Sequence, residues 1–319
     1  MIMHRPDPTA AIRSLRSAAP YIRMYKGKTF VVKAGGGVFA DPAAVRGLIE
    51  QIAILHYFGV RVVFVHGGGP QLTEVTEALG VPTRMVQGRR VTDQKAIDAT
   101  SMVLNGLINT KLLALCREMN IDAVGISGVD AGLIRAHKRG PVKIDTGETV
   151  DYGFVGDIDL VDTTVLTKLL DNGLMPIISP LSADDNGTLL NINGDTVAAA
   201  IGAALSAEKL MLCTGAPGIL ERVEDPSSII SYTDLAGLKR LREEKKIVDG
   251  MLPKARAIED ALRGGVRRVH VMSYKSPEGI LAEVFTNEGA GTLIVADINA
   301  LSAAEQQSGG APAKQASSA

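Results

Sequence analysis

Short runs rich in β-branched residues alternate with longer stretches of helical periodicity along the chain. Residues 29–33 are predicted to form a first buried strand, residues 43–57 a helix and residues 61–65 a second strand. Strands that alternate with helices in this way are typical of doubly wound sheets, in which helices cover both faces of parallel strands. The sequence therefore predicts an α/β fold.

The same pattern continues toward the carboxyl end. The polar, turn-rich residues 138–157 are more typical of a hairpin than of a crossover. A chain of 319 residues can form one large domain or two closely packed lobes, and we place a lobe boundary near residue 180. Further helices are expected at residues 71–79, 94–119, 196–205 and 254–263, and further strands at residues 123–126, 174–179, 209–213 and 268–272.

The two ends of the chain depart from this pattern. Residues 1–28 carry six basic residues and a single acid, Asp7, a composition also found in transit peptides. Ile12, Leu15 and Ile22 would instead form an apolar stripe on a short docking helix, which we favour because the first strand follows directly. Residues 296–319 are rich in Ala, Ser, Gln and Gly, and we expect a disordered tail.

Composition argues against several classes of function. A net charge of −1 provides no basic field for nucleic acids or membrane surfaces, and a chain without Trp has few side chains for base stacking. No apolar stretch approaches the roughly 20 residues of a membrane span. The two distant cysteines indicate reduced thiols in a cytoplasmic protein. The five histidines lack metal-ligand spacing, so no protein-held metal is expected.

Two glycine clusters follow two predicted strands, Gly35–Gly37 after the first and Gly67–Gly69 after the second. Exposed backbone N–H groups at such turns can bind phosphate or carboxylate groups, and the missing Cβ lets a ligand come close. Tight turns that bind nothing remain an alternative for either cluster. Neither cluster matches the phosphate loop or the dinucleotide fingerprint.

Charged residues near these loops favour a binding site. Lys33 ends an otherwise apolar strand, where an ammonium group either reaches solvent at the sheet edge or meets an anion. The planar fork of Arg90 could hold a carboxylate by two hydrogen bonds, although a surface salt bridge would also explain it.

Two further charges lie at expected helix starts. Asp195 could be the N-cap of its helix or an acid that orients other groups. Lys254 stands at a helix entrance, where the dipole opposes a cation unless an anion binds nearby. Phosphoryl transfer depends on positioning and charge neutralisation. The two glycine loops, the two lysines, Asp195 and Arg90 are suited to that chemistry.

Several ordered motifs resemble the amino-acid kinase superfamily and, within it, the family of N-acetylglutamate kinases. The resemblance extends over roughly residues 20–295. The matching segments are Val32 to Gly36, His66 to Gln71, Gly88 to Asp93, Val124 to Gly128, Gly153 to Gly156, Asn191 to Ala198, Gly250 to Lys254 and Glu288 to Thr292.

The resemblance implies a three-layer αβα sandwich around an open, mainly parallel sheet. Residues 29–180 would form the amino-acid substrate lobe and residues 181–295 the ATP-binding lobe. The expected reaction is ATP-dependent phosphorylation of the γ-carboxylate of N-acetyl-L-glutamate to an acyl phosphate, a step of arginine biosynthesis. Magnesium would bind together with ATP and would not need a separate set of protein ligands.

The resemblance also implies roles for individual residues. Lys33 and Lys254 would neutralise the transferring phosphoryl group from opposite sides, and Asp195 would hold both ammonium groups. Gly35 and Gly36 would contact ATP. The N–H groups of Gly68 and Gly69 would contact the acyl substrate, and Arg90 and Asn191 would bind the α-carboxylate of that substrate.

The segment Pro20–Arg23 is similar to the N-terminal helix of arginine-inhibited members of the family, in which such helices interlace dimers into a hexamer. We therefore expect a homo-oligomer, a dimer or a trimer of dimers, with residues 1–28 as its oligomerisation helix. His270, Glu283 and Gly289 fall where these members bind the inhibitor, which implies L-arginine as an effector.

Four positions depart from the family pattern. Ala34 replaces a tyrosine, Gly37 stands where a small polar residue is common, Gly215 stands where an acid or amide is usual, and Asp249 replaces a glycine. These changes predict altered nucleotide affinity rather than a different fold.

Two other functions remain open at this stage. The chain could be a related kinase that acts on an aminoadipate derivative, or a non-catalytic arginine-sensing or partner-binding protein with the same fold. Retention of Lys33, Asp195 and Lys254 argues against a sensor, because a sensor needs no phosphoryl-transfer groups.

Overall fold

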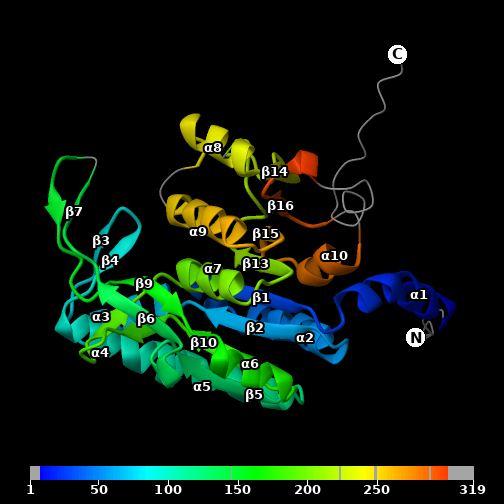
Figure 1. The fold of residues 1–319 in the computed structure, drawn as a ribbon, viewed down its shortest axis with the longest axis horizontal. Coiled ribbons are helices and arrows are strands. Elements are labelled where there is room, and N and C mark those ends of the chain that lie inside the picture. The colour runs from blue at the N-terminus through cyan, green and yellow to red at the C-terminus, as the bar shows by residue number, and fades with distance from the viewer. Residues whose placement is uncertain (1–7, 145, 223, 248–249, 287–288, 301–319) are drawn as a thin grey trace, which may run out of the picture.

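A computed structural model describes residues 8–144, 146–222, 224–247, 250–286 and 289–300 of the protein. Its centre is an eight-stranded sheet in which every neighbouring pair is parallel except β15 and β16 (Figure 1). The predicted α/β fold with a mainly parallel sheet is thereby confirmed. In sheet order the strands are β14 (Tyr232–Asp234), β16 (Thr292–Val295), β15 (Arg268–Ser273), β13 (Lys209–Thr214), β1 (Thr29–Ala34), β2 (Arg61–His66), β10 (Met175–Ser179) and β5 (Ala123–Ser127).

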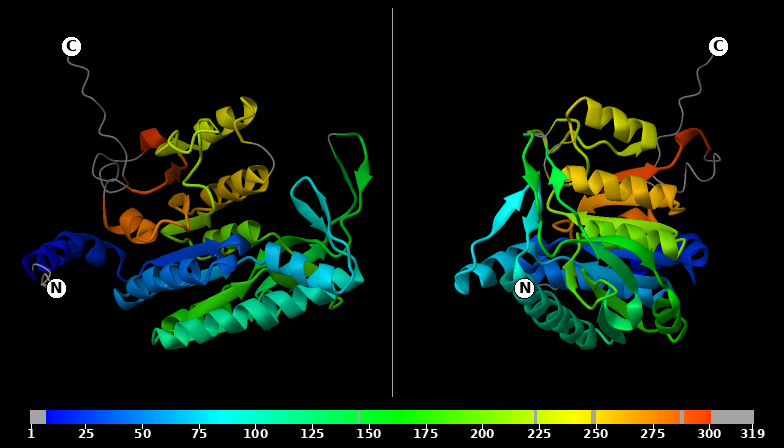
Figure 2. Two further views of the ribbon diagram at one scale, coloured as in Figure 1. Left: turned by 180° about the vertical axis from the view of Figure 1, so that it is seen from behind. Right: turned by 60° about the vertical axis from the view of Figure 1, so that its left-hand side comes forward.

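Helices cover both faces of this sheet, as the two views in Figure 2 show. Residues of β1 alternate between the two hydrophobic clusters that result, because successive side chains of a strand point to opposite faces. Val31 packs in one cluster, whereas Phe30 and Val32 pack in the other. The helices are α2 (Pro42–Tyr57), α3 (Gly69–Ala78), α4 (Gln94–Ser101), α5 (Asn109–Glu118), α6 (Thr164–Asp171), α7 (Gly194–Ala204), α8 (Leu235–Glu243), α9 (Met251–Arg263) and α10 (Gly279–Phe285).

Smaller strands extend the amino-terminal part of the fold. A four-stranded sheet contains β12 (Leu189–Asn191), β11 (Leu181–Ala183), β6 (Ile134–Lys138) and β9 (Gly156–Val161), in that order. The hairpin predicted within residues 138–157 is confirmed by the antiparallel pair β7 (Val142–Lys143) and β8 (Thr149–Val150). A second hairpin joins β3 (Arg84–Val86) to β4 (Arg89–Val91).

The helix predicted at residues 94–119 is continuous but not uniform. A wider, π-helical stretch, Met102–Ile108, separates α4 from α5. Contrary to the expectation from the sequence, Gln94–Glu118 is long and apolar enough to cross a membrane by length and composition alone, a test that the core helix of a folded domain also passes. Val103, Leu104 and Ile108 are buried in the cluster that contains Val32, which accounts for part of this apolar character, whereas Met102 and Leu107 are exposed.

The amino-terminal helix α1 spans Pro8–Tyr25 and lies beside α10 (Figure 1). Its last residue, Tyr25, is buried and packs edge-on against Phe30 with ring centroids 5.2 Å apart. Ile12 and Leu15, two members of the predicted stripe, are 55% and 58% exposed. Most of the predicted tail, residues 301–319, lies outside the described residues, and Ile298–Ala300 form one 3₁₀ turn.

Candidate active site

Three charged side chains from three elements meet at the carboxyl edge of the central sheet. Lys33 comes from β1, Asp195 from the first turn of α7 and Lys254 from the first turn of α9. The Nζ atom of Lys33 lies 2.8 Å from Oδ1 of Asp195 and forms an ion pair with it, while Nζ of Lys254 donates a hydrogen bond of 2.9 Å to Oδ2. All three are predicted site residues, and the fold brings them together.

Burial gives this cluster its electrostatic character. Burial alone would raise the pKa of Asp195, but the ammonium groups of Lys33 and Lys254 lower that pKa well below its ordinary value. Burial lowers the pKa of Lys254, an effect that the carboxylate of Asp195 opposes. Two ammonium groups thus share one carboxylate, and the cluster has an excess positive charge that can be directed at an anion.

Asn193 caps the helix that carries Asp195. Its side-chain oxygen accepts hydrogen bonds from the backbone N–H groups of Asp195 and Thr196, at 2.9 and 3.1 Å. The alternative that Asp195 itself is the N-cap is therefore wrong. Because the cap is provided by a neighbouring amide, both carboxylate oxygens of Asp195 remain available to the lysines.

The two glycine clusters pack directly against each other. The N–H group of Gly67 donates a hydrogen bond of 2.8 Å to the carbonyl of Ala34. A Cβ on Gly36 would lie 2.6 Å from Cδ of Pro70 and 2.8 Å from the backbone nitrogen of Gly69. Only glycine fits at position 36, since the loops approach each other at backbone distance.

The π-helical stretch supports the second glycine loop. A Cβ on Gly68 would lie 2.5 Å from Cδ1 of Ile108 and 2.6 Å from Cδ2 of Leu104. Both side chains belong to Met102–Ile108, so the widened turn packs beneath the loop that the sequence analysis assigned to substrate. Segments of this kind are frequent at functional sites.

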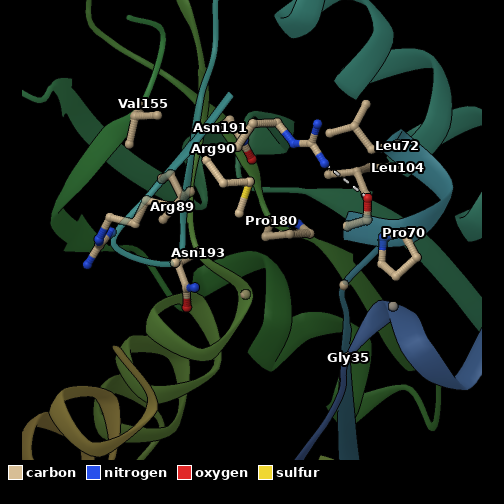
Figure 3. A pocket seen from close by; sticks show the side chains of 18 of the residues that line it. Gly35, Pro70, Leu72, Arg89, Arg90, Leu104, Val155, Pro180, Asn191 and Asn193 are labelled. Atoms are coloured by element: carbon tan, nitrogen blue, oxygen red, sulfur yellow. Dashed lines mark hydrogen bonds between the residues drawn. The ribbon is translucent and has the colours of Figure 1, made fainter. Parts of the chain in front are cut away.

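A cavity of about 270 Å³ opens between the glycine loops, the β3–β4 hairpin and the start of α7 (Figure 3). Leu72, Leu104 and Val155 give it an apolar wall. Lys33 lines the cavity, and behind it Asp195 forms ion pairs with both Lys33 and Lys254. The predicted site residues that line it are Lys33, Gly35, Gly36, Gly68, Gly69, Arg90 and Asn191.

Arg90 is held in place by uncharged groups. Its guanidinium donates a hydrogen bond of 3.1 Å to the carbonyl of Gly69 (Figure 3). It also donates to Oγ1 of Thr83 and Oγ1 of Thr73, both at 2.6 Å. Among the described residues no acid forms a salt bridge with it, so the surface salt-bridge alternative is wrong. Burial lowers its pKa. Two of the five guanidinium N–H donors remain for a ligand.

Sequence reasoning passed over Arg89, which lines the same cavity (Figure 3). Burial lowers the pKa of Arg89, and the nearby positive charges of Arg139 and Arg256 lower it further. Adjacent side chains of a β-strand normally point to opposite sides, so only one of two neighbouring arginines would be expected to face a cavity, yet both line this one.

The three predicted effector residues lie together at a second place, near α10. Nδ1 of His270 is 2.8 Å from Oε2 of Glu283, whose other oxygen accepts hydrogen bonds of 2.6 Å from the N–H groups of Ala290 and Gly291. Gly289 has a positive φ of 58°, and a Cβ there would lie 3.1 Å from Glu283.

Lys209, which the sequence analysis treated only as part of a strand, completes this second cluster. It is fully buried, and its Nζ lies 3.0 Å from Nε2 of His270 and 5.2 Å from the ring centroid of Tyr25. Burial lowers the pKa of Lys209 to about 7. Burial also lowers the pKa of His270 to about 4, so its imidazole is neutral near pH 7. The cluster therefore connects α1 to α10.

The chain is similar to known proteins over most of its length. The sequence profile described as "Amino acid kinase family" matches residues 28–273. The chain is 48% identical over 295 residues to an acetylglutamate kinase of Myxococcus xanthus, covering 91% of this chain and 95% of the relative. It is 38% identical to the chloroplastic acetylglutamate kinase of Arabidopsis thaliana, covering 91% of this chain and 81% of the relative.

Solved structures share the fold. The N-acetylglutamate synthase of Neisseria gonorrhoeae, in complex with coenzyme A and N-acetyl-glutamate, matches with a TM-score of 0.78 and 26% identity over 90% of this chain. This chain spans 63% of the synthase chain. Carbamate kinase from Giardia lamblia bound to AMP-PNP matches with a TM-score of 0.59 and 17% identity, over 86% of this chain and all of that chain, a likeness of fold alone.

Proposed function

Because the chain belongs to the amino acid kinase family, we propose that it is a kinase that transfers the γ-phosphate of ATP to the side-chain carboxylate of N-acetyl-L-glutamate. The product would be N-acetyl-L-glutamyl 5-phosphate, an intermediate of arginine biosynthesis. The observation that carries this proposal is the contact of Lys33 and Lys254 with one buried carboxylate beside two glycine loops.

In this proposal the two lysines stabilise the charge that develops on the phosphoryl group. Both ammonium groups are buried and held by Asp195, so they need no reorganisation when the reaction occurs. The protein provides position and charge, which is what phosphoryl transfer requires. Gly35 and Gly36 would contact the ATP phosphates.

The cavity would hold the acyl amino acid. Arg90 and Asn191 would bind its α-carboxylate, and the backbone N–H groups of Gly68 and Gly69 would bind the carboxylate that is phosphorylated. These four residues line one cavity that also contains Lys33, so acceptor and donor groups would meet at the lysine end.

Magnesium would be held mainly by the nucleotide. Among the residues that the structure describes, no three His, Cys, Asp or Glu side chains are grouped so that they could hold a metal ion. We propose instead that the ion enters on the ATP phosphates, where it would neutralise negative charge.

The substrate role of Arg90 can be tested by Arg90→Lys. We expect the KM for N-acetylglutamate to rise about tenfold with kcat nearly unchanged. The guanidinium uses three N–H donors on Thr83, Thr73 and the Gly69 carbonyl and keeps two for the substrate, whereas an ammonium group has three donors in all. Substrate saturation curves measure this effect. Arg84→Lys, in the exposed part of the same hairpin, is the matched control. An unaltered saturation curve for Arg90→Lys would refute the role.

The reaction itself is tested by trapping the acyl phosphate with hydroxylamine in the presence of ATP. N-acetylglutamate is expected to be the preferred acceptor over free glutamate and aminoadipate derivatives. Preference for an aminoadipate derivative would favour the related kinase. Absence of acyl phosphate with every acceptor would leave a non-catalytic binding protein.

L-arginine is proposed as a feedback inhibitor that binds near His270, Glu283 and Gly289. A second N. gonorrhoeae synthase structure, in complex with coenzyme A and L-arginine, has a TM-score of 0.75 and 24% identity to this chain, covering 90% of this chain and 65% of that one. Adding arginine to the hydroxylamine assay tests the proposal.

We also propose that the protein is a cytoplasmic homo-oligomer, either a dimer or a trimer of dimers. The exposed apolar side chains of Ile12 and Leu15 on α1 would be covered in such an assembly. Multi-angle light scattering distinguishes a monomer, a dimer and a hexamer.

A further inference from the structure

The phenol of Tyr274 extends over two glycines that lie far apart in the sequence. A Cβ on Gly37 would lie 3.1 Å from the Tyr274 hydroxyl oxygen, and a Cβ on Gly215 would lie 3.7 Å from the same atom. Gly37 belongs to the first glycine loop, and Gly215 follows β13. These are two of the positions where the sequence departs from the family pattern, and one hydroxyl occupies the space near both.

The side chain of Tyr274 is fixed by its surroundings. Its backbone N–H donates a hydrogen bond of 2.9 Å to the carbonyl of Thr214, which ties the end of β15 to the end of β13. Its ring packs against the hydrophobic cluster that contains Val32, Cys213 and Met272. The backbone hydrogen bond and the packing of the ring therefore fix the position of the Tyr274 side chain.

The hydroxyl, in contrast, has no partner within the part of the chain that the structure describes. Tyr274 is partly exposed, so its hydroxyl reaches the boundary between protein and solvent. An anchored ring with an unused donor is suited to contact a ligand, because little conformational entropy is lost on binding.

The position of this hydroxyl indicates which ligand it meets. Ala34 pairs with Cys213, and Cys213 pairs with Met272, so β1, β13 and β15 end side by side at the carboxyl edge where open α/β sheets bind ligands. The neighbouring residues Gly35 and Gly36 are those assigned above to ATP. Tyr274 does not line the cavity assigned to the acyl amino acid.

We propose that Tyr274 is a nucleotide-binding residue of this chain, whose hydroxyl donates a hydrogen bond to the phosphate chain of ATP. This inference rests on the proposed kinase function. In place of side chains at positions 37 and 215, the loops present bare backbone, and the phenol reaches across both from β15. The resulting contact would offset the polar groups that these two positions lack.

The test is nucleotide affinity, measured by calorimetry with AMP-PNP and Mg²⁺. Tyr274→Phe keeps the ring and removes the donor, and we expect the Kd for AMP-PNP to rise about tenfold, as for other hydrogen bonds to charged groups. The KM for N-acetylglutamate should not change. Tyr57→Phe, which removes an exposed hydroxyl elsewhere, is the matched control. An unchanged Kd for Tyr274→Phe would overturn the proposal.

A second pair of variants, Gly37→Ser and Tyr274→Ala, tests whether the two side chains compete for the same space. Gly37→Ser alone should weaken AMP-PNP binding, because the new side chain meets the phenol at 3.1 Å. Tyr274→Ala alone should also weaken it. The double variant should bind better than either single one, since the serine hydroxyl then enters the space that the phenol vacates. Strictly additive losses would contradict this prediction.

Failure of this inference is distinguishable from failure of the proposed function. Normal AMP-PNP binding by Tyr274→Phe, together with acyl phosphate formation by the unaltered chain, would overturn the role of Tyr274 alone. Loss of binding in Tyr274→Phe, with no acyl phosphate formed by the unaltered chain, would support the nucleotide contact and refute the reaction. Absence of nucleotide binding by the unaltered chain would overturn both.

Discussion

Lys254→Ala is expected to lower kcat by about a thousandfold, the effect typical of removing one preorganised charge from a transition state. The ammonium group of Lys254 is buried at the start of α9 and already hydrogen-bonded to Asp195 at 2.9 Å. It would therefore act mainly on charge that develops during transfer, so the KM values for ATP and N-acetylglutamate should change much less than kcat. Steady-state kinetics with both substrates measure the two effects separately.

The control for this variant is Lys239→Ala, which removes an exposed lysine from the adjacent helix α8. It should retain full activity. If Lys254→Ala turned over at the normal rate while remaining folded, Lys254 would have no part in the chemical step. A large rise in KM with unchanged kcat would instead make Lys254 a substrate-binding residue.

Local signals were sufficient to predict the centre of the fold. The strands β1, β2, β10, β13 and β15 are mostly apolar and buried, and a glycine follows β1, β2 and β13 directly. Because parallel strands bring their carboxyl ends to one edge, Lys33 and the glycine loops could be placed there from the sequence. The resemblance to a known family added the long-range partner, Lys254, which no local pattern connects to Lys33.

Elements and residues that depend on tertiary contacts could not be predicted in this way. The strand β16 has only four residues and was not predicted from the sequence. The cap formed by Asn193 required knowledge of where α7 begins, since Asn191, Asn193 and Asp195 are all acceptable N-caps by residue type. Lys209 begins a strand and would normally reach solvent, but the ring of Tyr25 and His270 enclose it.

Among the family departures, the structure places Gly37 and Gly215 near one another and leaves Asp249 outside the described residues. Ala34 is buried at the end of β1, where it packs in the same cluster as Val32. From the sequence alone these positions are separate losses of polar groups. In the folded protein, two of them are neighbours of a single tyrosine.

Asp195→Asn is expected to reduce both activity and stability. The two buried ammonium groups would lose their shared carboxylate, and breaking a buried ion pair from one side typically destabilises a fold by about 3 to 5 kcal/mol. We expect the free energy of unfolding at pH 7 to fall by about 3 kcal/mol and kcat to fall at least as much as in Lys254→Ala. Urea denaturation monitored by circular dichroism, together with the hydroxylamine assay, measures both.

The pH dependence gives this prediction a sign that can be checked. The pKa of Asp195 is lower in the folded protein than in the unfolded chain, so its stabilisation is present above the unfolded pKa of about 3.9 and is lost as pH falls through the folded value. The stability difference between the unaltered protein and Asp195→Asn should therefore be constant from pH 5 to 8 and shrink in stronger acid.

The double variant Asp195→Asn with Lys254→Met separates the effect of unpaired charge on stability from the loss of activity. Removing one ammonium group relieves part of the uncompensated charge, so the double variant should be more stable than Asp195→Asn alone while remaining inactive. If the double variant were no more stable, the destabilisation would come from packing or from α7 rather than from unpaired lysines. If Asp195→Asn alone retained normal kcat, the carboxylate would not hold the two lysines for phosphoryl transfer.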